Sequence, residues 1–376
     1  MHLASMSIRD FRNIAKAELE FCTGLNLVIG NNGQGKSNLL EAVGILATGR
    51  SFRRAPPQAL RRHGQPWFRL EGRTRANALN HCLEFQGHPD RQTARLNGKP
   101  MTAASAMGHA LAAVVVTPET LRLVQGGPAE RRAHLDWLVF SRRRDHAPLM
   151  RDYRLALHAR NAVLQRPIHN TAELNAWEDR LAVLGARVTL NRRTLLEHLT
   201  TRLTPSLQAL AVAESRFEAH LSCQLDRCAT PWTTEEEAAN LYRQLLVKSR
   251  DKDRAPGVTS IGPHRDDLHL RLDGRPLAKY GSQGQQKRFI LALKLAEADL
   301  LRETLAESPV FLLDDPAAEL DRKGFSLFMG ILAELECQLF ITSCSAGEIP
   351  WSGKPPTMLV VHGGNFEVEP NPLWDA

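Results

Sequence analysis

The sequence predicts an α/β fold of two lobes, one of which is built from both ends of the chain. Short apolar or alternating runs, broken by turn residues, indicate strands near both ends, at 3–29 and 310–341. Long stretches with helical spacing lie between them. We therefore predict lobe I from residues 1–118 plus 256–376, and lobe II, a mostly helical insertion, from residues 119–255.

Lobe I begins with strands. Apolar runs predict strands at 3–8, 17–21 and 25–29, and a helix follows over 38–47. Glycines and prolines divide the next segments, up to about residue 117, into short strands and hairpins. The N-terminal part of lobe I is therefore rich in strands.

The pattern changes after Pro118. Apolar residues recur at helical spacing over 153–164 and 174–188, and the one strand signal lies at 217–225. Strand patterns then return in the second part of lobe I, where the apolar run 310–313 predicts a buried strand. Lobe II is therefore expected to be mostly helical.

Composition limits the classes of protein that the chain can form. With 376 residues and 43% hydrophobic content it can form two cores, and its formal charge of +7 weakly favours a polyanionic partner. The six cysteines are scattered, with no C-x-x-C pair, which predicts reduced thiols and a cytoplasmic protein. No apolar run approaches the roughly 18 residues that cross a membrane, so no membrane partner is expected.

The strand predicted at 25–29 runs into a glycine-rich loop and then a helix, which is the context that the motif G-x-x-x-x-G-K-S requires. Glycines let backbone N–H groups and the helix N-terminus close around a phosphate. Lys36 would reach the β- and γ-phosphates of ATP, and Ser37 would ligate Mg²⁺. The predicted ATP-binding residues of this loop are Gly30, Asn31, Asn32, Gly33, Gln34, Gly35, Lys36, Ser37 and Asn38.

Two carboxylates follow the buried strand predicted at 310–313 and would complete a magnesium site. Asp314 would hold the Mg²⁺ shell, and Asp315 would orient or deprotonate the attacking water. Asp315 and Lys36 are therefore the predicted catalytic residues. Two acids that merely cap a buried strand would be the better interpretation if this segment stood alone. The P-loop makes the catalytic interpretation the stronger one.

A polar turn precedes the apolar helix predicted at 289–301. Its residues Ser282, Gln283, Gly284 and Gln285 resemble the ABC signature motif, in which a helix N-terminus meets the γ-phosphate from the opposite subunit. Taken alone, an ordinary turn would explain these residues equally well. The order of P-loop, signature and acid pair predicts an SMC/ABC-type P-loop ATPase head as lobe I, with lobe II inserted into it.

Most of the excess positive charge lies in lobe II, which has 22 Lys and Arg against 17 Asp and Glu. Seven arginines fall within residues 142–166, where contact with DNA backbone phosphates is one hypothesis. The candidates for this contact are Arg142, Arg143, Arg144 and Arg151. A solvated helical face is the equally open alternative.

Further motifs resemble the RecF family over nearly the whole chain. Beside the P-loop and the signature they include Asp10-Phe11-Arg12-Asn13, Gly49-Arg50-Ser51-Phe52-Arg53, Thr117-Pro118-Glu119-Thr120-Leu121, Gly262-Pro263-His264-Arg265-Asp266-Asp267-Leu268 and Glu319-Leu320-Asp321. The resemblance implies an SMC-like ATPase head, ATP-dependent homodimerisation on DNA and a weak, DNA-stimulated ATPase activity that acts as a switch. It also implies recombinational repair of gaps and stalled replication, with RecO and RecR in the loading of RecA, and a part in SOS induction.

The same resemblance places Arg12 and Asn13 beside the nucleotide, although a plain surface turn would also explain them. Two features depart from the wider ABC pattern. The sequence Thr342-Ser343-Cys344 has no switch histidine, so γ-phosphate sensing would fall to hydroxyls or another group and hydrolysis would be slow. Pro316 follows the acid pair, and its fixed φ would stiffen the segment that it begins.

Two further pairs of basic residues keep more than one interpretation. His264 and Arg265 follow a Gly-Pro turn, where they would touch the nucleotide or a partner subunit, or fix the junction of the lobes. Arg131 and Arg132 would bind DNA or pair with Asp136 about one helical turn away.

The main alternative function is that of another ABC-type ATPase, such as a transporter subunit. The long segment between Ser37 and Ser282, the basic insertion and the missing switch histidine speak against a transporter. A true SMC head would need hundreds of residues of coiled coil. The sequence therefore favours a DNA-binding ATPase. Because aromatic residues are few, contact with the backbone of a duplex or of a single-strand/duplex junction is expected.

Overall fold

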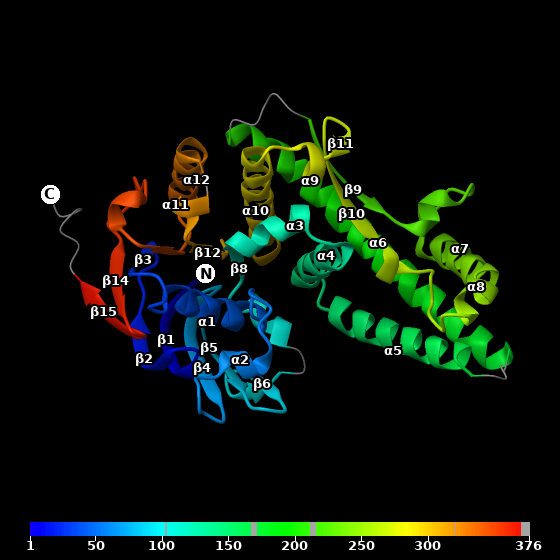
Figure 1. Cartoon of the computed structure of the whole chain (residues 1–376), viewed down its shortest axis with the longest axis horizontal. Helices are drawn as coiled ribbons and strands as arrows, with labels where there is room; N and C mark the ends of the chain where they lie inside the picture. The colour runs from blue at the N-terminus through cyan, green and yellow to red at the C-terminus, as the bar shows by residue number, and fades with distance from the viewer. Residues whose placement is uncertain (102–103, 167–170, 211–215, 320, 370–376) are drawn as a thin grey trace. The chain divides into compact units, whose positions relative to one another are not determined.

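The computed structural model describes the chain except for residues 102–103, 167–170, 211–215, 320 and 370–376 (Figure 1). Two compact units make up the chain. The first, here called the head, consists of residues 1–121, 202–214 and 281–376. The second, the inserted unit, consists of residues 122–201 and 215–280.

A six-stranded, mainly parallel sheet organises the head. Its strands, in spatial order, are β15 (Asn365–Glu369), β14 (Thr357–His362), β3 (Leu25–Ile29), β13 (Leu339–Ser343), β12 (Val310–Asp314) and β8 (Ala113–Val116). Only the pair β14–β15 is antiparallel. The central strands β12 and β13 are buried along their whole length, which is why they read as continuous apolar runs. Parallel pairing brings the carboxyl ends of β3, β12 and β13 to one edge.

A second, antiparallel sheet lies in the head. Its strands, in spatial order, are β2 (Ile14–Glu20), β1 (His2–Phe11), β4 (Phe68–Ala76), β5 (Leu79–Gly87), β6 (Gln92–Leu96) and β7 (Lys99–Pro100). Helix α1 (Lys36–Thr48) packs against strands of both sheets (Figure 1). One hydrophobic core joins Ile8 and Leu70 of the antiparallel sheet, Val43 of α1 and Leu312 of the parallel sheet. The helix is thus apolar on nearly every side because it is enclosed.

Further α-helices complete the head. They are α2 (Pro57–Leu60), α10 (Gln283–Leu305), α11 (Pro316–Glu319) and α12 (Arg322–Glu334). Helix α10 packs against β8, and its apolar side is buried. The head therefore has the α/β architecture that the sequence predicts.

The inserted unit is mostly helical. Its elements are α3 (Arg122–Gln125), α4 (Pro128–Arg142), α5 (His146–Leu164), most of α6 (Thr171–Ala209), β9 (Phe217–Ser222), α7 (Glu235–Lys248), α8 (Arg250–Arg254), β10 (Asp267–Leu272), β11 (Arg275–Pro276) and α9 (Leu277–Tyr280). Its core includes Tyr153 of α5, Leu181 of α6 and Tyr242 of α7. No helix of the described residues is long and apolar enough to cross a membrane.

The boundaries of the two units differ from the predicted ones. Residues 256–280, which the sequence analysis assigned to lobe I, group with the inserted unit. The reason is that β10 pairs with β9 in an antiparallel register, and β11 pairs with β10. In the other direction, residues 202–210, which lie within the predicted lobe II, group with the head.

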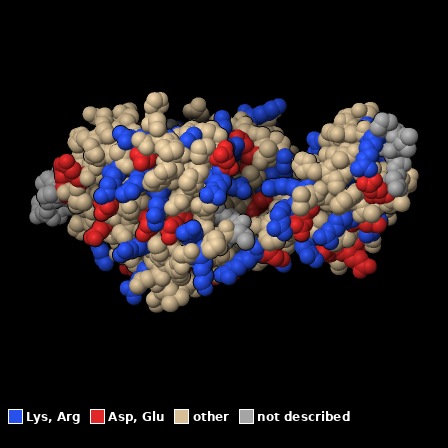
Figure 2. Space-filling view, turned by 90° about the horizontal axis from the view of Figure 1, so that it is seen from below, with Lys and Arg blue, Asp and Glu red and all other residues tan. Residues whose placement is uncertain are grey.

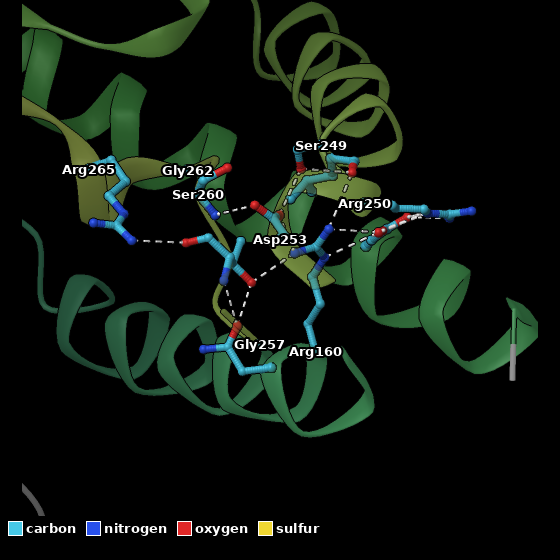
Figure 3. Close-up of polar contacts among 12 residues, drawn as sticks. Arg160, Ser249, Arg250, Asp253, Gly257, Ser260, Gly262 and Arg265 are labelled. Carbon is cyan, nitrogen blue, oxygen red and sulfur yellow. Dashed lines mark hydrogen bonds and ion pairs between the residues drawn. The ribbon is translucent and has the colours of Figure 1, made fainter. Parts of the chain in front are cut away.

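A buried ion-pair network occupies the interior of the inserted unit (Figure 3). The Arg160 side chain is completely buried and donates to Glu178 at 3.0 Å and to Asp253 and Thr259 at 2.8 and 2.9 Å. Arg250 also pairs with Glu178. Arg160 belongs to the run of arginines considered above for phosphate contact. Its burial shows that it holds the core together and is not available to DNA.

A second buried cluster contains a carboxyl with an altered proton affinity. Asp266 accepts a hydrogen bond from Arg192 at 3.1 Å, and its Oδ1 atom is buried without a hydrogen-bond partner among the described residues. Burial raises the pKa of Asp266 from 3.8 to about 7, against the lowering effect of the Arg192 guanidinium. A proton on the carboxyl would remove the charge that burial disfavours.

This cluster predicts a pH-dependent stability. Because the folded state binds the Asp266 proton more tightly than the unfolded chain, its contribution to stability is present below about pH 4 and is lost as the pH rises towards about 7. Within that window, wild type should lose about 1.4 kcal/mol of unfolding free energy per pH unit relative to Asp266→Asn. Urea unfolding at several pH values measures the difference. If the difference in unfolding free energy between wild type and Asp266→Asn stayed constant from pH 5 to 7, Asp266 would be ionised throughout that range. Asp145→Asn is the control for the loss of an exposed charge.

Candidate nucleotide-binding site

The P-loop has the geometry of a phosphate-binding loop. Strand β3 leads into residues 30–35, and α1 begins at Lys36 with no side chain capping its free N–H groups. Gly35 has φ +120°, and a Cβ there would lie 2.9 Å from the Asn13 side chain. At Gly30 a Cβ would lie 2.7 Å from the Val361 carbonyl oxygen. Glycine is therefore required at both positions, and the uncapped helix N-terminus is a ready anion site.

Lys36 is a buried cation with neutral contacts. Its side chain reaches back along the loop, where Nζ donates to the Gly30 carbonyl oxygen and lies 3.6 Å from the Cys344 sulfur. Only 6% of Lys36 is exposed. Because these partners carry no full negative charge, an arriving phosphate would gain a strong ion pair with this ammonium group.

The acid pair at the end of β12 is held by the neighbouring strand. The Thr342 hydroxyl donates to Asp314 Oδ1 at 2.9 Å and accepts from the Asp315 N–H at 2.8 Å. Asp315 has φ +48°, a conformation that costs a non-glycine residue free energy and that marks functional sites. Pro316 is the first residue of α11, where a missing N–H costs nothing.

One pocket brings most of these groups together. It is lined by Asn31, Asn32, Gly33, Gly35, Lys36, Ser37, Asn38, Arg53, Asp315 and Thr342. Arg53, for which the sequence predicts no role, lies 3.1 Å from Asn38 and 3.5 Å from Asp314. The position of Arg53 in the motif at residues 49–53 was the signal in the sequence that could have indicated a role at the site. The oxygen atoms that line the pocket are of the kind that Mg²⁺ prefers. The described residues contain no cluster of three His, Cys, Asp or Glu side chains that could hold an ion, so phosphate oxygens would have to complete the Mg²⁺ shell.

Arg12 and Asn13 lie beside the loop and brace it. Asn13 donates to the Gln34 carbonyl oxygen at 2.9 Å and accepts from the Asn38 side chain at 2.8 Å. The Arg12 guanidinium forms two hydrogen bonds of 2.8 Å with Glu41, which is completely buried in α1. Glu41 was missed by the sequence analysis. It is the anchor that holds Arg12 at the rim of the P-loop.

The signature segment forms the N-terminus of α10. Ser282 caps the helix: its hydroxyl accepts from the Gln285 N–H at 3.2 Å, while the Gln285 side chain accepts from the Ser282 N–H at 2.8 Å. Gln283 is the first helical residue. At Gly284 a Cβ would meet no described atom closer than 4.0 Å. The packing of the head therefore does not explain why residue 284 is a glycine, and the space beside it is open.

The four arginines proposed for DNA contact differ in their surroundings. Arg143 donates to Asn191 at 3.1 Å, and Arg151 lies 3.2 Å from Asp152 in the exposed surface. Arg144 is exposed, whereas Arg142 is partly buried. Lysine and arginine side chains are spread among carboxylates over the face in Figure 2, without one continuous basic stripe. On this face, charge alone therefore does not identify a DNA surface.

The two pairs of basic residues with open interpretations make contacts inside the inserted unit. Both ring nitrogens of His264 are engaged, with the Tyr153 hydroxyl at 2.6 Å and the Thr259 carbonyl oxygen at 2.9 Å. Burial lowers the pKa of His264 to about 4, which keeps the ring neutral. Its Nδ1 therefore accepts from Tyr153, and its Nε2 donates to Thr259. Arg265 also contacts the Thr259 carbonyl oxygen, at 3.4 Å.

Arg131 and Arg132 likewise have internal partners, but the predicted partner was wrong. Arg131 pairs with Asp267 at 2.8 Å, and Arg132 donates to the Asp266 carbonyl oxygen at 2.7 Å. Asp136 instead pairs with Arg192 at 2.8 Å. Pairing across the fold thus replaces the expected pairing along one helix.

A P-loop beside parallel strands that end in an acid pair defines an ATPase head of the ABC/SMC type. The family model described as the RecF/RecN/SMC N terminal domain matches residues 2–352. The DNA replication and repair protein RecF of Magnetococcus marinus is 56% identical over 372 residues, 97% of each chain. The chain belongs to the RecF family of DNA replication and repair proteins.

Other relatives agree with this assignment. RecF of Geobacter sulfurreducens is 33% identical over 354 residues, 94% of this chain and 95% of the other. The solved structure of the recombination mediator protein RecF-ATP in the RecFOR pathway is 29% identical, covers 98% and 99% of the two chains, and has a TM-score of 0.89. An Smc head bound to a domain of ScpA, 14% identical with a TM-score of 0.54 over 98% of both chains, shares the fold. The family assignment favours DNA repair over transport.

Proposed function

We propose that the chain is an ATP-dependent DNA-binding switch that dimerises on DNA in recombinational repair. The observation that carries the proposal is the open N-terminus of α10, where Gly284 has free space on a head that also holds a P-loop. A glycine that its own subunit does not need fits the close approach of a phosphate bound to a second copy. The switch would then depend on two half-sites.

Each half-site would supply different groups. Lys36 and the N-terminal N–H groups of α1 would bind the β- and γ-phosphates, while Ser37 and Asp314 would hold Mg²⁺, which neutralises phosphate charge when bound. Ser282 and Gly284 of the second copy, with the N–H groups of α10, would close on the γ-phosphate. ATP would favour the dimer because only ATP contacts both copies, and ADP would lack the bridging phosphate.

Hydrolysis would release the dimer. Asp315 would orient the attacking water or accept its proton, and Thr342 would hold both acids in place through its hydroxyl. Cys344 stands beside Lys36 and lies 3.4 Å from Asn32, where an ABC ATPase would place a histidine. A thiol is a weak hydrogen-bonding group, so a slow, DNA-stimulated ATPase that works as a switch is expected.

The cellular role follows from the family. Relatives carry the name DNA replication and repair protein, and two solved relatives are described as recombination mediators in the RecFOR pathway. We infer that this chain binds the backbone of a duplex or of a single-strand/duplex junction in the cytoplasm. It would act with RecO and RecR in loading RecA at gaps and stalled forks, and so contribute to SOS induction.

Mixing two inactive variants tests the shared site. Lys36→Ala destroys one half-site, and Gly284→Asp places a carboxylate against the γ-phosphate in the other half-site. Each variant alone should hydrolyse no ATP above background, but a mixed dimer contains one intact pair of half-sites and should recover activity. Activity in Gly284→Asp alone, or no recovery in the mixture although heterodimers form, would contradict a site shared between two copies.

A smaller change at Gly284 should separate stability from dimerisation. Gly284→Ala adds a methyl group within the first turn of α10, where alanine favours the helix by up to about 1 kcal/mol. The monomer should therefore be as stable as wild type or more stable, while ATP-dependent dimerisation weakens about tenfold because the methyl group meets the phosphate. Thermal unfolding and sedimentation measure the two effects. Equal dimerisation by wild type and Gly284→Ala would place the phosphate elsewhere.

A further inference from the structure

A polar pocket lies in the inserted unit between the end of α4 and the middle of α6. It is lined by Val139, Arg142, Arg143, Asn191, Thr194, Leu195 and His198. We call this site the arginine pocket. Two members of the arginine run at 142–144 line it, whereas Arg144 does not. Arg142 and Arg143 therefore share one pocket, whereas Arg144 is simply exposed.

One hydrogen-bond donor on the wall of the arginine pocket has no acceptor among the described residues. The Nη1 atom of Arg142 is buried and has no hydrogen-bond partner among the described residues. A buried donor without an acceptor costs about 1–3 kcal/mol, and more when it is charged. Asn191, Thr194 and His198 add polar atoms to the same wall. The Arg142 Nη1 atom therefore calls for an acceptor that no described residue supplies.

The charge of the pocket points to an anion. Arg143 donates to Asn191 at 3.1 Å and forms an exposed ion pair with Asp145 at 3.4 Å, whereas no ion pair is formed by Arg142 among the described contacts. A cation in the last turn of α4 would be favourable for the helix alone, which is the simplest reason for an arginine at position 142. That reason leaves the buried, unpartnered Nη1 atom beside a pocket unexplained.

We propose that the arginine pocket binds a phosphate group, and that in the DNA-bound protein this group is a phosphodiester of the backbone. Two guanidinium groups match the oxygens of a phosphate, and Val139 and Leu195 offer an apolar wall with no aromatic platform for a base. The contact would therefore be independent of sequence. That the bound phosphate belongs to DNA rests on the proposed function, whereas the binding of a phosphate group in the arginine pocket does not.

Salt-dependent DNA binding tests the proposal. Arg142→Gln should weaken ATP-dependent binding to a duplex about 10- to 100-fold and lower the number of counterions released by about one, whatever the sequence. Arg144→Gln removes the same charge two residues away, outside the pocket, and should weaken binding less than about threefold. Thr194→Glu, an exposed position on the wall, should reproduce the Arg142→Gln result without removing a buried group.

Inorganic phosphate distinguishes the source of the ligand. In a Lys36→Ala background, which removes the P-loop lysine, phosphate should raise the unfolding temperature, and the added Arg142→Gln change should abolish this rise. If that loss occurs while Arg142→Gln and Thr194→Glu leave DNA binding unchanged, the pocket takes free phosphate. If neither DNA binding nor phosphate stabilisation changes in these variants, the proposal is overturned. Failure of wild type to bind DNA would instead overturn the proposed function, with the phosphate measurement still deciding the pocket.

Discussion

Replacing Lys36 with alanine is expected to weaken ATP binding by about 100-fold or more, because the phosphates lose a desolvated ion pair worth about 2–5 kcal/mol. Lys36 is buried, and in the absence of nucleotide its ammonium group has a carbonyl and a thiol as neighbours. Removing it should therefore leave the stability of the nucleotide-free chain intact or raise it. ATP titration by calorimetry and thermal unfolding without nucleotide measure both quantities.

Lys16→Ala provides the matched control for this prediction. Lys16 lies on β2 of the same head, and its side chain is 62% exposed in a surface pair with Glu18. Its loss should leave ATP affinity within about twofold of wild type, because exposed pairs contribute little. If Lys36→Ala bound ATP as tightly as Lys16→Ala does, the P-loop assignment would be wrong.

Replacing Arg160 with methionine should lower the unfolding free energy of the inserted unit by about 3–5 kcal/mol. The Arg160 guanidinium forms an ion pair with Asp253 (Figure 3). Arg160 and Arg250 together neutralise Glu178. The side chains of Arg160, Asp253 and Glu178 are almost completely buried. Among the described residues, the variant would leave Asp253 with the Ser249 hydroxyl and the Ser260 N–H as its hydrogen-bond donors. A buried carboxylate without a cation is costly. Urea unfolding followed by tryptophan fluorescence measures the loss.

Arg166→Met tests whether burial, rather than the loss of any arginine, causes this effect. Arg166 pairs with Glu173 at 2.7 Å, but its side chain is 53% exposed. The expected loss is therefore less than about 1 kcal/mol. Equal unfolding free energies for Arg160→Met and Arg166→Met would show that the buried network contributes no more than a surface pair.

The phosphate-binding part of the site could be predicted from the sequence because its residues are local. A strand, a glycine loop and a helix follow one another between residues 25 and 48, and glycine is required there by the backbone itself. The acid pair is equally local, at the end of an apolar run. The contributions of Glu41 and Thr342 are different in kind. Each acts through partners distant in sequence, Arg12 and Asp314, which no local pattern indicates.

Other parts of the fold were hidden for identifiable reasons. A mid-helix arginine such as Arg160 usually lies at the surface, and its burial depends on carboxylates that α6 and α8 supply. The boundary near residue 256 was misplaced because strand pairing, not composition, assigns β10 to the inserted unit. The alternation Asp-Leu-His-Leu-Arg-Leu over 267–272 was an available strand signal, but it does not indicate which sheet the strand joins.

The central claim is that ATP joins two copies of this chain on DNA and that hydrolysis through Asp315 separates them. The most direct measurement is the sedimentation mass of wild type and Asp315→Asn with ATP or ADP, in the presence of a gapped duplex and at two salt concentrations. We predict a DNA-bound dimer with ATP and not with ADP, longer-lived in Asp315→Asn and weaker at the higher salt concentration. A chain that stays monomeric, or ignores DNA in every nucleotide state, would contradict the account.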